Sequence, residues 1–266
     1  MLWFGLAFAL ASVCSAQSIK TSHAKVELLS QSSAIAPGQT VWLDVHFALE
    51  KGWHIYWKNP GDSGQPPVLR WELPPGFSAG GIRWPRPEKI KHSSIADYGY
   101  EDEVMLLVPV RVPSGAKTGS PAEIMLKAEW LICSEICIPG KARLKLSLPV
   151  AATPAEDMTK AKLFAEARRL LPRAWPALWT AGATSEKDAF VLIIRSGQPL
   201  EAGEFFPSEA SQIENAAPQT WEPTPQGAKV RLKKSDQLLK SIRFLKGLLV
   251  LGGGDSYEIQ ARVTNR

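Results

Sequence analysis

The sequence lacks several features that would place it in a common functional class. Its formal net charge is only +5 over 266 residues and its basic residues are scattered, so a nucleic-acid-binding patch is not expected. No serine stands in the pattern of a nucleophile elbow, and no glycine-rich loop has phosphate-binding spacing. Beyond residue 172 there is neither cysteine nor histidine, so that part of the chain offers no candidate chemistry.

Long hydrophobic runs are also scarce. The exception is Leu2–Val13, which carries no charge and precedes the small residues Cys14 and Ala16. This arrangement is typical of an export signal, so we expect a signal peptide over 1–16 with cleavage ahead of Gln17. A membrane anchor or a lipid on Cys14 is the alternative. The run is shorter than the roughly 20 apolar residues of a membrane-spanning helix, and the residue before Cys14 is not small.

Cysteine is rare, and only Cys133 and Cys137 remain once a signal peptide is removed. An even number of thiols in an oxidising compartment indicates that the two can pair. The C-x-x-x-C spacing is wider than that of common zinc sites and has no second ligand pair near it in sequence. We therefore assign no metal ligands and expect no cofactor, although a soft monovalent metal bound with His54 or His92 is an alternative.

The residues that are abundant favour short strands joined by turns. Hydrophobic residues make up 45% and charged residues 21%, which is typical of a soluble globular protein. The length of 266 residues allows two domains. Proline and glycine are frequent, at 21 and 20 residues. Apolar residues alternate with polar ones, as in half-buried strands, over 41–49, 124–132 and 144–150. Residues 17–152 are therefore predicted to form a β-sandwich domain.

The spacing of apolar residues changes near residue 153, from the alternation of strands to the period of a helix. Thr153 can cap a helix, and apolar residues then recur at helical spacing until Pro172, so we expect a helix over 154–171 within a linker over 153–172. Strand-like segments return further on, so 173–266 is expected to be a second β-sandwich domain. The predicted class is all-β, with two sandwich domains joined by a helical linker.

The spacing of the two cysteines predicts a hairpin. Four steps of extended chain would separate their Cα atoms by about 13 Å, whereas a disulfide needs about 4.4–6.8 Å. A turn centred on Glu135 pairs Cys133 with Cys137 and matches apolar residues across the two arms. The further pairs expected are Ala128 with Ala142, Leu126 with Leu144, and Ile124 with Leu146.

The alternation of side chains between the two faces of this hairpin also predicts where the sulfurs lie. Core-facing positions on both arms are even-numbered and both cysteines are odd-numbered, so their sulfurs should project away from the core and be accessible to another protein's thiolate. Pro139 and Gly140 could disturb the return arm. A purely structural disulfide is the alternative, and closing so short a loop contributes only about 2 kcal/mol in the chain-entropy model.

Two groups of aromatic residues are candidates for the rim of a site. Trp53, Tyr56 and Trp57 precede a turn-rich stretch, and Tyr98-Gly99-Tyr100 follows Asp97. Packing in a sandwich core is the alternative for each ring.

The run Ala128–Gly140 resembles the cysteine hairpin of the periplasmic N-terminal domain of the DsbD/ScsB thiol:disulfide interchange proteins. The stretches Trp53–Gly61, Trp84–Pro87 and Asp97–Glu103 are similar to the same domain in the same order. Looser similarities to the second module of the ScsB-like branch follow at Phe205–Pro207, Ile213–Glu214, Gln219–Trp221 and Gly247–Leu251.

The resemblance implies an immunoglobulin-like first domain and a thiol-disulfide oxidoreductase of the protein-disulfide reductase type in the periplasm. Cys133 and Cys137 would be catalytic. They would take electrons from a membrane-embedded disulfide reductase or its thioredoxin-like domain and pass them to periplasmic thioredoxin-like proteins. A loop around Asp97, Tyr98 and Gly99 would cap the cysteines, although Asp97 stands where the family often has an aromatic residue.

Either cysteine could attack first, and we take Cys137 as the initial nucleophile. Two other readings stay open. One is an exported binding module whose disulfide only pins a hairpin, and the other is a protein that handles a soft metal such as copper.

Overall fold

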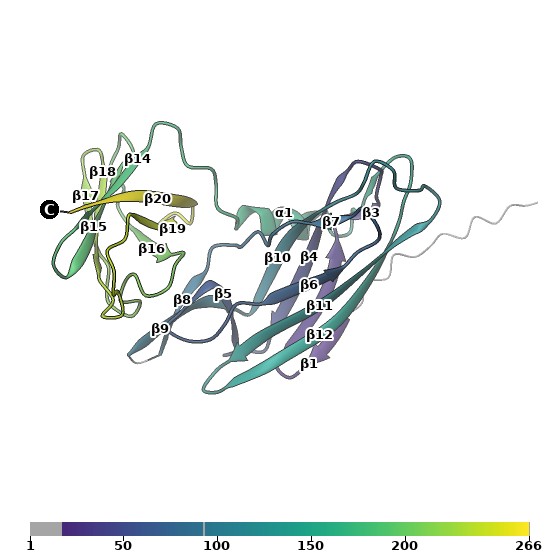
Figure 1. The fold of residues 1–266 in the computed structure, drawn as a ribbon, viewed down its shortest axis with the longest axis horizontal. Helices are drawn as coiled ribbons and strands as arrows, with labels where there is room; N and C mark the ends of the chain where they lie inside the picture. The colour runs from purple at the N-terminus through teal and green to yellow at the C-terminus, as the bar shows by residue number, and fades with distance from the viewer. Residues whose placement is uncertain (1–17, 93, 266) are drawn as a thin grey trace, which may run out of the picture.

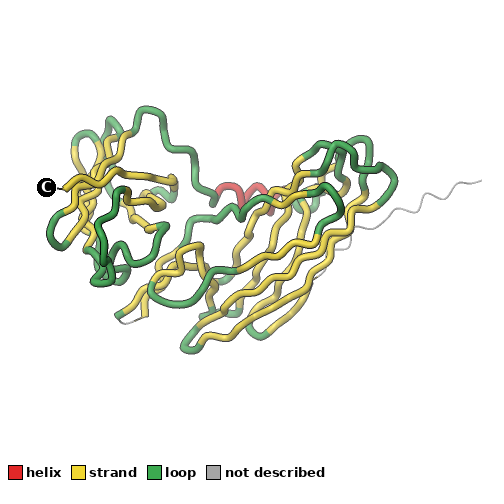
Figure 2. The backbone as a smooth tube through the Cα atoms, viewed as in Figure 1, coloured by secondary structure: helices red, strands yellow, loops and turns green. Residues whose placement is uncertain are grey.

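Strands form more than half of the described chain, which comprises residues 18–92 and 94–265 of the computed structural model (Figures 1 and 2). The predicted all-β class is confirmed, with a single helix, α1 (Ala161–Arg169), among the described elements. The predicted signal peptide over 1–16, including Cys14, lies outside the described residues.

The first part of the chain is a sandwich of two antiparallel sheets. One sheet has the strand order β1-β2-β4-β10-β7 and the other the order β12-β11-β5-β9-β8, with β6 also paired to β11. The first sheet comprises β1 (Ser18–Thr21), β2 (Ala24–Ser30), β4 (Thr40–Leu49), β7 (Ser78–Ala79) and β10 (Glu103–Arg111). The second comprises β5 (His54–Gly61), β6 (Val68–Glu72), β8 (Glu88–His92), β9 (Ile95–Glu101), β11 (Pro121–Cys133) and β12 (Cys137–Pro149).

Alternation along the strands builds the core between these sheets. On β4 the odd-numbered side chains from Val41 to Phe47 are buried in it, and on β11 the even-numbered ones from Ala122 to Ile132 are. This arrangement leaves the other face of β11 for polar side chains and for the cysteine that ends the strand.

The second part of the chain forms one continuous seven-stranded sheet. Its strand order is β16-β19-β20-β14-β15-β18-β17, and its strands enclose a separate apolar core. Gln219 bonds both the N–H and the carbonyl of Phe205 on the edge strand β16, at 2.8 and 2.7 Å, and so brings the opposite edge of the sheet against it. The strands are β14 (Thr180–Ser185), β15 (Ala189–Arg195), β16 (Gly203–Pro207), β17 (Thr220–Thr224), β18 (Gly227–Lys233), β19 (Phe244–Leu251) and β20 (Ser256–Asn265).

The helix between the two parts is shorter than expected. The prediction of a helix over 154–171 with Thr153 as its cap is wrong at its start, because α1 begins at Ala161 after Lys160. The residues before it form β13 (Ala155–Glu156), which pairs with β3 (Ser32–Ala34). Because Ala155 and Glu156 pair with β3, their backbone groups form hydrogen bonds in an extended conformation. This extended conformation competes with a helical one.

The two parts of the chain are in contact through β16. Phe206 is counted among the buried residues of the first core, with its ring 5.1 Å from that of Tyr98 and 6.4 Å from that of Trp57. The Asn59 amide donates a hydrogen bond of 2.8 Å to the carbonyl of Pro207. The domain limits of 17–152 and 173–266 stay a prediction.

Helix α1 covers a buried acid on the outer face of the first sheet. Asp44 is fully buried and lies opposite Leu29 on β2 and Leu107 on β10, which pack with Phe164 of the helix. Burial raises the pKa of the Asp44 carboxyl well above its usual range, and the charge of Glu27 adds to the effect.

A raised folded-state pKa means that wild-type stability falls as the pH rises from the unfolded-state pKa of about 3.9 through the folded-state value. We therefore predict that Asp44→Asn stabilises the protein by on the order of 1–3 kcal/mol at pH 8 and has a smaller effect near pH 4. Urea unfolding of both proteins at several pH values measures this. An equal stability difference at every pH would contradict it.

Candidate redox site

The cysteines close the hairpin formed by β11 and β12. The predicted register is confirmed, because Cys133 lies opposite Cys137 and the pairing runs without a shift to Pro121 and Pro149. The two cysteines form a disulfide with their Cα atoms 4.1 Å apart. Gly140 keeps the return arm in register, because any Cβ there would lie 2.2 Å from the Trp130 ring on the facing strand.

The two cysteines differ in exposure. Cys137 is exposed, whereas Cys133 is only 2% exposed. Both lie outside the apolar core cluster, as the pleat predicts, but Cys133 also pairs with His54 at the start of β5 and is covered on that side. The prediction of an accessible disulfide therefore holds for Cys137 and is wrong for Cys133.

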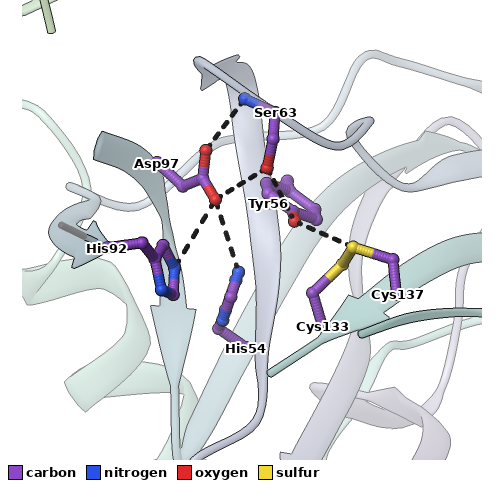
Figure 3. The surroundings of a disulfide bond; sticks show 7 residues. All are labelled: His54, Tyr56, Ser63, His92, Asp97, Cys133 and Cys137. Atoms are coloured by element: carbon purple, nitrogen blue, oxygen red, sulfur yellow. Dashed lines mark hydrogen bonds and ion pairs between the residues drawn. A yellow bond between two sulfur atoms is a disulfide. The ribbon is translucent and has the colours of Figure 1, made fainter. Parts of the chain in front are cut away.

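Tyr56 is the side chain that contacts the exposed sulfur. Its hydroxyl lies 3.6 Å from Cys137 Sγ and 3.4 Å from Ser63 Oγ (Figure 3). Gly64 lies against the Tyr56 ring, where an added Cβ would be 2.0 Å from a ring carbon. Burial raises the pKa of the Tyr56 phenol, so the hydroxyl stays protonated and is available as a donor to sulfur.

A second polar group lies beside the disulfide on the neighbouring strands. Asp97 Oδ2 lies 3.8 Å from Nε2 of His54 and 3.6 Å from Nε2 of His92. Ser63 holds this carboxylate through its backbone N–H at 2.9 Å and its hydroxyl at 2.8 Å. Burial lowers the pKa of His54, and the charge of Asp97 opposes that shift.

The predicted rim residues do not all lie at the site. Tyr56 borders the sulfur, and Gly99 pairs with it across the sheet. Asp97 joins the polar group. Trp53 stacks on the His23 ring at 3.8 Å.

The remaining rings are structural. Trp57, Tyr98 and Tyr100 are buried in the first core. The Tyr98 hydroxyl donates to Asn215 at 3.0 Å and the Tyr100 hydroxyl to the carbonyl of Pro85 at 2.9 Å. The expected capping loop is also corrected, because residues 97–99 lie within strand β9 and pair with β5.

Further residues, not predicted from the sequence, connect the site to the second part of the chain. The Asn215 amide donates to Asp62 Oδ1 at 2.7 Å, and Asp62 Oδ2 accepts from the backbone N–H of Ala96 at 2.8 Å. These bonds hold the segment that carries Ser63 against the strand that carries Asp97. The turn signals around residues 59–64 marked the segment, but Asn215 has no signal in the sequence.

Together the fold and the site define a class: an immunoglobulin-like sandwich that presents one disulfide at the tip of a hairpin. Residues 25–149 match the family described as "Thiol:disulfide interchange protein DsbD, N-terminal". No curated protein matches the chain.

A similar fold is found in a solved structure. The N-terminal periplasmic domain of ScsB from Proteus mirabilis is similar with a TM-score of 0.69 at 15% identity, over 92% of this chain and 96% of that one. The periplasmic chaperone SfaE and the YadV chaperone match at TM-scores of 0.25 and 0.23 and 10% identity. They cover 90% and 88% of this chain and 100% and 98% of theirs. Across residues 18–92 and 94–265, no helix has the length and apolar character to cross a membrane.

The contact of Tyr56 with Cys137 predicts how the thiol behaves when the disulfide is reduced. A hydroxyl that donates to the sulfur stabilises the thiolate, so Tyr56→Phe should raise the pKa of the Cys137 thiol and slow its alkylation at neutral pH by roughly 3- to 10-fold. The rate of alkylation by iodoacetamide against pH measures both effects. Tyr100→Phe, whose hydroxyl bonds Pro85, is the matched control. Equal rates in wild type and Tyr56→Phe would contradict the assignment.

Proposed function

We propose that this protein passes reducing equivalents through Cys133 and Cys137 in the periplasm. Electrons would come from a membrane-embedded disulfide reductase or its thioredoxin-like domain and go to periplasmic thioredoxin-like proteins. The observation that carries the proposal is a disulfide at a hairpin tip with one exposed sulfur, next to a phenol that can donate to it. The family of residues 25–149 supports thiol:disulfide interchange as the chemistry.

The exchange is a two-electron transfer in two steps. In the reduced protein the Cys137 thiolate attacks one sulfur of a substrate disulfide, which forms a mixed disulfide and releases the first substrate thiolate. The Cys133 thiolate then attacks Cys137 Sγ, which restores the protein disulfide and releases the second substrate thiolate. The substrate gains two electrons and takes up two protons, and the cysteine pair gives up the same number.

The surface around Cys137 supports docking of another protein. Ile136, next to Cys137 in the turn, is 65% exposed, and Val68 on β6 is 44% exposed. A groove of about 480 Å³ runs between β6 and the return arm and is lined in part by Pro66, Leu131 and Pro139. Exposed apolar side chains beside a shallow groove are typical of a surface that binds a partner.

The reduction potential of the pair tests the proposal. We expect a value between roughly −180 and −270 mV, the range of proteins that exchange disulfides repeatedly. It is measured by equilibrating the purified protein with glutathione buffers and trapping free thiols. A potential below about −300 mV would identify a structural disulfide and favour the binding-module alternative.

Single cysteine variants test the order of attack. Cys133→Ser keeps the exposed nucleophile but removes the resolving thiol, so it should accumulate a mixed disulfide with an oxidised thioredoxin-like protein. Cys137→Ser should form at least 10-fold less adduct, because Cys133 is buried. Non-reducing gels and mass spectrometry measure the adducts. More adduct with Cys137→Ser than with Cys133→Ser would reverse the assignment.

A further inference from the structure

Three potential metal ligands meet beside the disulfide. His54 lies on β5, His92 ends β8 and Asp97 lies on β9, and these strands are neighbours in the order β5-β9-β8. One ligand atom from each lies within 4.8 Å of the other two. In Figure 3 both imidazole rings lie below the Asp97 carboxylate, and a dashed line joins each ring to the same carboxylate oxygen, Oδ2.

The spacing is close to that of a bound cation. Zinc binds imidazole nitrogen and carboxylate oxygen at about 2.0–2.2 Å, so ligand atoms at tetrahedral angles lie about 3.3–3.6 Å apart. Nε2 of His92 is 3.6 Å and Nε2 of His54 is 3.8 Å from Asp97 Oδ2. The His92 side chain is 37% exposed, so it has room to adjust and a cation can reach the group from solvent.

One of the ligand atoms lacks a partner. Nε2 of His54 is buried and has no hydrogen-bond partner among the described residues, and a buried polar atom without a partner is unfavourable. It lies 3.8 Å from the carboxylate, too far for a hydrogen bond. A cation between these groups would satisfy the nitrogen.

The carboxylate is already oriented for such a role. Ser63 donates its hydroxyl to Oδ2 and its N–H to Oδ1 of Asp97. A carboxylate oxygen accepts along two lone pairs, so Oδ2 keeps one for a cation. Hydrogen bonds of this kind, from residues behind the ligands, fix ligand orientation in metal sites.

We propose that His54, His92 and Asp97 form a binding site for a divalent cation of the zinc class next to the disulfide. Two imidazoles and one carboxylate favour such a cation over magnesium or calcium, which prefer oxygen ligands. Three protein ligands leave the fourth position of a tetrahedral site open. The site does not use the cysteine sulfurs and is therefore separate from the exchange chemistry.

Isothermal titration of the oxidised protein with ZnCl₂ tests the proposal, because the intact disulfide keeps thiolates out of the measurement. We expect one zinc per chain. His92→Ala should weaken binding at least about 10-fold and still fold, since His92 is the most exposed of the three ligands. Asp97→Asn should also weaken it. MgCl₂ should give no saturable binding.

His23→Ala is the matched control, because His23 pairs with Glu50 and stacks on Trp53 away from the cluster. With four histidines in the chain, imidazole NMR signals give a second readout. Zinc should shift the signals of His54 and His92 and leave those of His23 and His46 in place. No saturable binding, equal affinity in His92→Ala and wild type, or a loss with His23→Ala as large as with His92→Ala would overturn the proposal.

Discussion

The antiparallel pairing of β11 with β12 is the constraint on which the site depends. Its register is fixed by the core, because the even-numbered side chains of both arms are buried against the facing sheet. A slip of one residue would turn these side chains to solvent and lose their apolar burial. The position of Cys133 opposite Cys137 is therefore enforced by side chains far along the hairpin, such as Leu126 and Leu144.

The surroundings of the disulfide come from other strands and from the second part of the chain. Strand β5 supplies Tyr56 and covers Cys133 through His54. Phe206 fills part of the first core, and Asn215 bonds the segment that carries Ser63. Among the described residues, the hydrogen bond to the disulfide comes from Tyr56 in the first part of the chain, not from the second part. The second part supports the residues around the disulfide.

The hairpin, its register and the outward direction of the cysteines could be predicted from the sequence, because they follow from alternation along two long strands. The burial of Cys133 could not, because it depends on pairing with a strand about 80 residues earlier. The meeting of His54, His92 and Asp97 was hidden for the same reason. They lie on three strands, and the pairing of β5 with β9 shifts register between Tyr56 and Gly61, which no local pattern signals.

The start of helix α1 could not be predicted from the sequence for a different reason. Residues 154–160 have helical capping signals, yet Ala155 and Glu156 pair with β3 instead. Local propensity contributes tenths of a kcal/mol per residue, and tertiary hydrogen bonding overrides it. Tyr98 and Tyr100 illustrate the same point, since their alternation with Gly99 fits both a rim and a core, and only tertiary packing decides between them: both rings are buried in the first core, where Tyr98 bonds Asn215 and Tyr100 bonds the carbonyl of Pro85.

Strand β12 lies at the edge of its sheet, and this has a consequence for the behaviour of the protein in concentrated solution. An open edge that ends in an exposed sulfur would invite self-association, in which two copies pair their strands. Pro139 removes one backbone donor from that edge. Lys141 and Arg143 place positive charges along it, so a second copy approaching in the same way meets like charge. The composition of the edge strand thus disfavours pairing between copies of the chain.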